Sequence, residues 1–130
     1  MGAREDLPGA WRLVSMIARS SNGDVRYPFG TEASGLIMWD AHGWFSAQIA
    51  PGGEGASGDP LQYGAYFGTW EIDDAAGELV HHVAGSFTER LRGTDQRRGF
   101  TFEGNRLMLQ PPPTVTESET VTTTVTWERT

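Results

Sequence analysis

The segment from Tyr66 to Gly85 constrains the fold more than any other part of the chain. Its sequence, YFGTWEIDDAAGELVHHVAG, contains two runs of alternating apolar and polar residues around a turn at 73–77. This pattern predicts a β-hairpin, and pairing Asp73 with Glu78 would fix its register. One face would then carry a single imidazole in an otherwise apolar row: Tyr66, Gly68, Trp70, Ile72, Leu79, His81 and Val83. The opposite face would be polar, so we expect the His81 face to point into the core.

A second hairpin is predicted over residues 35–49, before this segment. If Trp39 pairs with Trp44, Met38 shares a face with Phe45. Both faces of this hairpin are half apolar, so the pattern does not decide which one points inward.

A third hairpin is predicted over residues 96–110, where Gly104-Asn105 indicates a tight two-residue turn. Such a turn fixes the register of the two strands. Phe100 and Phe102 would then lie on the same face as Arg98.

The rest of the chain adds further short strands and little helical periodicity. In the first of them the apolar residues fit a helix and a strand almost equally well, whereas in the last Trp127 ends a strict alternation. Residues 1–10 have the composition of a polar arm, and Ala50 to Gly64 form a glycine-rich loop. The remaining predicted strands cover residues 11–19, 25–29 and 121–127.

These elements predict an all-β fold in a single domain over residues 1–130. Strands joined by hairpins either close into an antiparallel up-and-down β-barrel or pack as a sandwich, and we expect a barrel of about 8 to 10 strands. A barrel of that size has room for one small ligand.

Charge and composition exclude several classes of function. The net charge of −7 argues against nucleic acid and anionic membranes as partners, because phosphate groups would be repelled. The chain has no cysteine and all 10 basic residues are arginine, which removes thiolate, Schiff-base and P-loop lysine chemistry. The N-terminal segment has no apolar signal region, and no apolar run approaches the ~20 residues of a membrane helix. We therefore expect a cytoplasmic protein; a homodimer formed through exposed strand edges is an open alternative.

A series of short segments runs in order through nearly the whole chain. They are GAWRLVS (9–15), VRYPFG (25–30), GLIMWDAHGWFSAQ (35–48), SGDP (57–60), YFGTWEID (66–73), VHHV (80–83), GTDQRRGF (93–100), GNRLML (104–109) and the terminal VTWER. This series resembles the bacterial lipocalin-like family of the calycin superfamily. The resemblance implies a small lipocalin-type β-barrel.

The resemblance also implies a candidate activity. Related small barrels in specialised-metabolite pathways act as cyclases that fold a polyketide chain inside an apolar cavity. The chain departs from the family pattern at 51–64, a shortened glycine-rich segment where members often carry a longer helical insertion. That difference implies a more open mouth of the barrel.

His81 and Arg98 are the candidate catalytic residues. The unperturbed pKa of imidazole lies nearest neutrality, so His81 facing a cavity would act as a hydrogen-bond donor or a general acid/base. Arg98 would bind a carboxylate, enolate or carbonyl oxygen. The alternatives are a core histidine satisfied by a neighbouring strand and an arginine paired with an acidic side chain at the barrel end. The candidate ligand-binding residues are large side chains of the hairpins and the last strand: Tyr66, Trp70, Met38, Phe100, Phe102 and Trp127.

No metal and no cofactor are expected. His81 and His82 would face opposite sides of their strand, His42 lies in a turn, and no acidic cluster completes a metal site. Residues 53–58 match G-x-G-x-x-G, but no helix of a βαβ unit follows, so they do not predict a dinucleotide site.

The sequence thus favours a protein that binds a hydrophobic small molecule in the barrel cavity. We expect it to act as a cofactor-independent cyclase or isomerase in specialised-metabolite biosynthesis of the polyketide type, through confinement and orientation of its substrate. One alternative is a non-catalytic carrier or storage protein for an apolar metabolite. Another is a barrel filled by its own side chains that serves as an interaction module.

Overall fold

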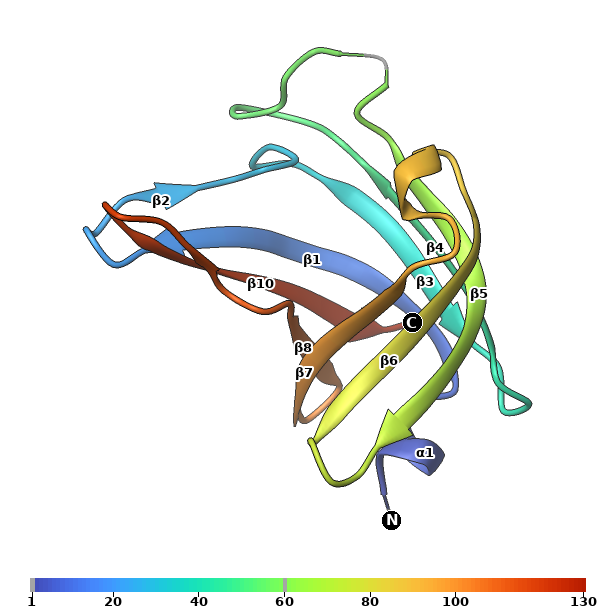
Figure 1. Ribbon diagram of the computed structural model, residues 1–130. Helices are drawn as coiled ribbons and strands as arrows, with labels where there is room; N and C mark the ends of the chain where they lie inside the picture. The colour runs from blue at the N-terminus through green and yellow to red at the C-terminus, as the bar shows by residue number, and fades with distance from the viewer. Residues whose placement is uncertain (1, 60) are drawn as a thin grey trace.

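The computed structural model describes residues 2–59 and 61–130 and shows a closed antiparallel β-barrel (Figure 1). The barrel strands are β1 (Gly9–Ser20), β3 (Ser34–Trp39), β4 (Trp44–Ala50), β5 (Gly64–Asp73), β6 (Glu78–Ser86), β7 (Asp95–Glu103), β8 (Arg106–Gln110) and β10 (Thr120–Arg129). Each pairs with the next in this order, and β10 pairs back onto β1. The predicted up-and-down barrel is therefore confirmed.

Within the described residues, four short elements lie outside this closed ring of strands. They are the helix α1 (Ala3–Asp6), the strands β2 (Val25–Arg26) and β9 (Thr114–Val115), and the 3-10 turn η1 (Glu89–Leu91). β2 flanks β1 and β9 flanks β10, so they extend the sheet where those two strands project beyond the barrel (Figure 1).

The central hairpin has the predicted register. Asp73 pairs with Glu78, Trp70 with His81 and Gly68 with Val83. A β-bulge at Gly68 brings the two backbones so close that a Cβ there would lie 1.9 Å from the carbonyl oxygen of His82. Glycine is therefore required at this position by the approach of the neighbouring strand.

The hairpin of β7 and β8 also has the predicted register. Phe102 pairs with Leu107 and Phe100 with Leu109, around the turn at Gly104-Asn105. Arg98 consequently lies two residues from Phe100 on the inner face of β7, as the tight turn predicted.

The register predicted for the hairpin of β3 and β4 is wrong by one residue. Trp39 pairs with Phe45, not with Trp44, because the loop closes between Asp40 and Trp44. The Asp40 carboxylate accepts hydrogen bonds from the backbone N–H groups of His42 and Trp44, and Gly43 supplies a φ of +103°. A one-residue slip exchanges the two faces of a strand.

The observed register places Phe45 on the face of Trp39, opposite to Met38, and the Trp39 face is the buried one. Ile37, Trp39 and Phe45 are buried, whereas Met38 is 46% exposed on the outer surface. The expectation that Met38 binds a ligand inside the barrel is therefore corrected.

A second irregularity explains why the first strand was ambiguous. β1 pairs Leu13 with Trp127 but Ser15 with Thr126, so a β-bulge inserts one extra residue. The inward positions are spaced by two residues up to Leu13 and shift by one after it, which brings Met16 opposite Val125. Such a sequence fits neither a period of 2 nor a helical period.

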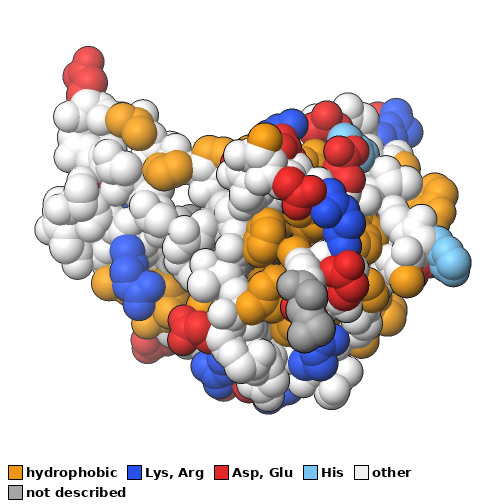
Figure 2. Space-filling view, turned by 90° about the horizontal axis from the view of Figure 1, so that it is seen from below, with side chains coloured by type: hydrophobic (Ala, Val, Ile, Leu, Met, Phe, Trp, Pro, Cys, Tyr) orange, Lys and Arg blue, Asp and Glu red, His pale blue; other side chains and the backbone are white. Residues whose placement is uncertain are grey.

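The N-terminal residues close one end of the barrel, which corrects the prediction of a polar arm. Leu7 is 1% exposed, and its carbonyl oxygen accepts a hydrogen bond of 2.9 Å from the buried indole of Trp11. The Arg129 guanidinium lies 4.2 Å from the Trp11 ring centroid. Seen from this end, hydrophobic side chains gather near the middle and charged ones surround them (Figure 2). Met1 lies outside the described residues.

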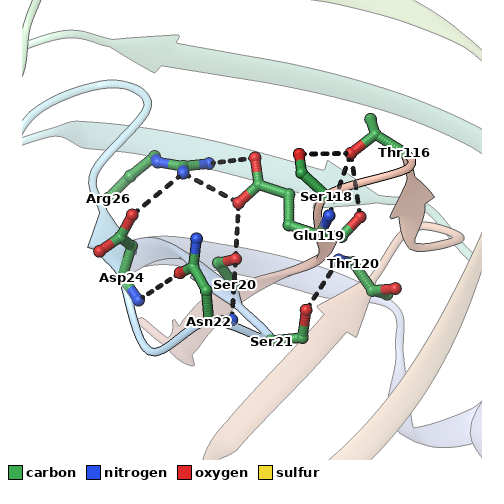
Figure 3. A network of polar contacts seen from close by, with 9 residues as sticks. All are labelled: Ser20, Ser21, Asn22, Asp24, Arg26, Thr116, Ser118, Glu119 and Thr120. Carbon is green, nitrogen blue, oxygen red and sulfur yellow. Dashed lines mark hydrogen bonds and ion pairs between the residues drawn. The ribbon is translucent and has the colours of Figure 1, made fainter.

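The projecting ends of β1 and β10 are held together by a polar network (Figure 3). The Glu119 carboxylate accepts hydrogen bonds from Ser20 Oγ at 2.5 Å and from the Arg26 guanidinium at 2.9 Å. Asn22 accepts a further hydrogen bond from the backbone N–H of Asp24. These contacts tie the turn between β1 and β2 to the start of β10.

The glycine-rich loop between β4 and β5 lies at the end of the barrel opposite α1 (Figure 1). Gly52 bonds through its backbone to Phe29 and Glu32, and Gln62 Nε2 donates to the Pro28 carbonyl at 2.6 Å. The loop therefore packs against the segment between β2 and β3. Pro60 of this loop lies outside the described residues.

Candidate functional site

A cavity of about 210 Å³ lies inside the barrel, and every barrel strand contributes to its wall. The apolar side chains that line it are Met16, Ile37, Ile49, Leu109, Pro111, Val125 and Trp127. The polar ones are Tyr66, His81, Arg98 and Thr123. Such a mainly apolar cavity with a few polar groups is the usual form of a small-molecule site.

His81 is the most enclosed polar residue of this wall. It is 2% exposed, and its ring stacks on Phe45 with a centroid distance of 4.0 Å and an interplanar angle of 16°. Trp39 Nε1 lies 2.9 Å from His81 Nε2. Because an indole N–H can only donate, Nε2 must accept and the proton of the neutral ring lies on Nδ1. His81 Nδ1 is buried without a hydrogen-bond partner among the described residues.

The charge state of His81 follows from this enclosure. Burial, with smaller contributions from the charges of Arg98 and His82, lowers the pKa of His81 to about 3. The ring is therefore neutral at pH 7, and this residue of the cavity wall has an N–H donor at Nδ1 without a partner among the described residues. A group with such a pKa is a poor general acid or base near neutrality. The donor role expected of His81 stays a prediction.

Arg98 brings a positive charge to the same cavity. Its guanidinium donates to the Arg97 carbonyl oxygen and to Gln96 Oε1, both at 2.9 Å. Among the described residues, no carboxylate lies within ion-pair distance of it. Burial lowers the pKa of Arg98, but a guanidinium keeps its charge in proteins. The predicted alternative of an ion-paired Arg98 is not what the described residues show.

Arg97 shows the contrast between the two faces of β7. It lies on the outer face and pairs with Asp73 at 3.0 Å and with Glu78 at 3.1 Å. The two neighbouring arginines thus differ in environment: one is neutralised at the surface and the other faces the interior.

Two of the predicted ligand-binding aromatic residues line the cavity. Tyr66 lies edge-on to His81 with ring centroids 6.4 Å apart, and burial raises the pKa of its phenol while the nearby Arg98 opposes that shift. Trp127 is 2% exposed, and its Nε1 is buried with no partner in the described part of the chain.

The other three predicted aromatic residues belong to the filled part of the interior. Trp70 donates its indole N–H to the Asp40 carbonyl at 3.0 Å, and Phe102 packs against Trp11 at 6.2 Å between ring centroids. Phe100 contacts Phe102 at 6.0 Å. None of the three is among the cavity-lining residues of the described chain.

Trp39, which bonds His81, and seven lining residues were not singled out as site residues from the sequence; the seven are Met16, Ile37, Ile49, Leu109, Pro111, Thr123 and Val125. Trp39 was placed on a face left undecided, and the hydrogen bond it donates depends on the register set by the Asp40 loop. Met16 follows the bulge in β1, which hides its direction. Thr123 shares a face with Trp127 in the predicted alternation, so the signal for its position was present.

Larger hollows occur on the outer surface of the barrel. One of about 420 Å³ is lined by Met38, Trp44 and Asp40 among others. Two buried side-chain atoms lack a hydrogen-bond partner in residues 2–59 and 61–130, His81 Nδ1 and Trp127 Nε1. Neither residue lines this outer hollow. The interior cavity is therefore the stronger candidate for a specific site.

No group of three His, Cys, Asp or Glu residues in the described part of the chain is placed to hold a metal ion. His82 lies on the outer face, with Nδ1 2.7 Å from Asp95 and Nε2 2.8 Å from Glu71. The two carboxylates bind opposite edges of one ring and do not converge on a common point. The described residues include no helix with the length and hydropathy needed to cross a bilayer.

Fold and cavity together define a small antiparallel β-barrel with an interior cavity. Residues 8–130 match the family model described as a lipocalin-like domain, and the chain belongs to this family. No curated protein and no solved structure is similar enough to the chain to count as a match.

Proposed function

We propose that this protein binds a hydrophobic small molecule inside its barrel. The observation that carries the proposal is the cavity of about 210 Å³, whose wall includes a residue from each of the eight barrel strands. Cavities of about 150 Å³ lined by apolar side chains are large enough for benzene. The site is smaller than the roughly 300 to 1,000 Å³ of pockets for drug-sized ligands, so the bound part is compact.

The end of the barrel that α1 covers is filled by side chains, which confines the proposed ligand to the rest of the interior. Leu7, Trp11 and Leu79 are each at most 1% exposed and fill the end that α1 covers. The third prediction, a barrel filled by its own side chains, describes this end only. A ligand would therefore occupy the part of the interior lined by His81 and Arg98.

A pair of adjacent threonines on β10 offers a test with a matched control. Thr123 lines the cavity, whereas Thr124 is bonded by Gln110 on the outer surface. Toluene added to the ¹⁵N-labelled wild type is expected to shift the indole resonance of Trp127. Thr123→Trp should abolish this saturable shift and Thr124→Trp should retain it. An unchanged spectrum of the wild type at saturating toluene would refute a working cavity.

A second candidate is catalysis of a cyclisation or isomerisation without a cofactor, in biosynthesis of the polyketide type. The observation that favours it is that Arg98 and the neutral N–H of His81 are both donors in one cavity. Such donors stabilise negative charge that develops on a carbonyl oxygen. The mechanism would be electrophilic polarisation of a confined substrate, with no proton exchange by His81 near pH 7.

Comparison of co-purifying molecules separates catalysis from carriage. Protein purified from its source as wild type and as Arg98→Gln would be denatured and the released compounds identified. A cyclised product on the wild type and its open-chain precursor on the variant would support catalysis. The same compound on both would leave the carrier function and reject the enzyme.

A further inference from the structure

The interior cavity has more hydrogen-bond donors than acceptors. His81 Nδ1 and Trp127 Nε1 are the buried side-chain nitrogens or oxygens without a partner among the described residues, and both residues are 2% exposed. Indole nitrogen is always a donor, and the bond from Trp39 makes His81 Nδ1 the protonated nitrogen. A buried donor without a partner is energetically unfavourable, so a molecule that accepts a hydrogen bond from it is favoured.

Arg98 adds charge to this excess of donors. A guanidinium has five N–H donors, and protein acceptors in the described chain engage its two Nη atoms once each. Both acceptors, a carbonyl and an amide oxygen, are neutral. They orient the guanidinium on β7 without neutralising it.

The acidic residues of the chain lie elsewhere. The chain has 17 of them and a net charge of −7, yet none is among the described residues that line the cavity. Arg97, Arg26 and Arg106 are each paired with a carboxylate at the surface. Arg98 differs from these three arginines, because it lines the cavity and has no carboxylate partner among the described residues.

We propose that the ligand of this cavity is an amphipathic molecule with a carboxylate or another oxyanion, paired with Arg98. The inference rests on the proposed binding function and names the chemical class of its ligand. The N–H groups of His81 and Trp127 and the hydroxyl of Tyr66 serve oxygen acceptors of the same ligand. Met16, Val125 and Leu109 contact its apolar part.

Three probes of one size test this proposal: benzoate, benzamide and benzylammonium. Their dissociation constants would be measured by calorimetry for the wild type, for Arg98→Gln and for Arg97→Gln. The last variant is the matched control, because it removes the same charge from the outer face of the same strand. The expected result for the wild type and the control is that benzoate binds at least tenfold more tightly than benzamide and that benzylammonium binds least. Arg98→Gln should lose the preference for benzoate.

The outcomes separate this inference from the function on which it rests. Equal affinity for benzoate and benzamide, or a preference that survives Arg98→Gln, would overturn the oxyanion proposal and leave small-molecule binding intact. Binding of none of the three probes by the wild type, together with no response to toluene, would overturn both. A variant that fails to fold would be replaced by Arg98→Met, which keeps the apolar stem and removes the charge.

Discussion

Acidification from pH 7 to pH 5 is expected to destabilise this protein through His81. The folded state holds the ring neutral, since burial lowers the pKa of His81 to about 3, whereas an unfolded histidine titrates near 6.5. Below pH 6.5 the unfolded chain therefore binds a proton that the folded chain rejects, and stability falls with pH until about pH 3. The titratable groups near the ring are Arg98 and Tyr66 on the neighbouring strands and His82 on its own strand, and none of them offers it a negative charge.

The magnitude follows from the difference between the two pKa values. A pH of 5 lies about 1.5 units below the pKa of the histidine in the unfolded chain, and each unit is worth about 1.4 kcal/mol. The free energy of unfolding should therefore fall by about 2 kcal/mol between pH 7 and pH 5. Such a loss is a large fraction of the stability of a typical small domain. Urea unfolding followed by tryptophan fluorescence at both pH values would measure it.

The variant His81→Gln isolates this contribution. Its amide oxygen can still accept from Trp39, and it carries no titrating ring, so it should lose about 2 kcal/mol less than the wild type between pH 7 and pH 5. An equal loss in both proteins would refute the argument that His81 is buried and neutral. The histidine resonances of the wild type give an independent check, because the His81 ring should show no protonation shift above pH 5.

Three further changes test the surroundings of the site. Trp39→Phe keeps the ring but leaves His81 Nε2 unbonded, and should cost about 1 to 3 kcal/mol in urea unfolding; a variant as stable as the wild type would contradict the hydrogen bond. Gly68→Ala forces a Cβ against the neighbouring strand and should cost roughly 1 to 3 kcal/mol, whereas Gly99→Ala, where a Cβ has room, should stay within about 0.5 kcal/mol. His82 lies between two carboxylates that raise its pKa, so its stabilisation is complete below about pH 6.5 and is lost as the pH rises through the raised pKa. Because the ring is 37% exposed, His82→Gln should change the free energy of unfolding by less than about 1 kcal/mol at pH 6. A larger change would contradict the description of these contacts as weak surface ion pairs.

The parts of the fold that the sequence predicted are those where a short turn and a period of 2 agree. The central hairpin and the hairpin around Gly104-Asn105 have the predicted registers, so His81 and Arg98 lie on the inner face as expected. In both, one buried face and one polar face leave a single acceptable register.

The errors arose where backbone geometry, not side-chain pattern, decides the direction of a residue. The loop after Asp40 is shorter by one residue than the loop assumed, so Phe45 shares a face with Trp39 and not with Met38, and the Trp39 face is the buried one. The bulge in β1 similarly concealed Met16. Both features depend on hydrogen bonds between residues that no alternation of polarity reveals.

The cavity itself could not be predicted from residue types. Phe100, Phe102 and Trp70 were expected to line a ligand site on the same grounds as Tyr66 and Trp127, yet the first three fill space. Whether facing side chains meet or leave a void depends on their volumes and rotamers in three dimensions. The burial of Leu7 at the end of the barrel was also not predicted, because one apolar residue in a polar segment carries no periodic signal.

The most direct test of ligand binding inside the barrel is native mass spectrometry of protein purified from its source, wild type beside Thr123→Trp. We predict a stoichiometric small-molecule adduct on the wild type that is released by denaturation and is absent from the variant. An adduct of equal occupancy on both proteins would contradict it. A wild-type protein that carries no adduct after incubation with an extract of its own cells would also contradict ligand binding inside the barrel.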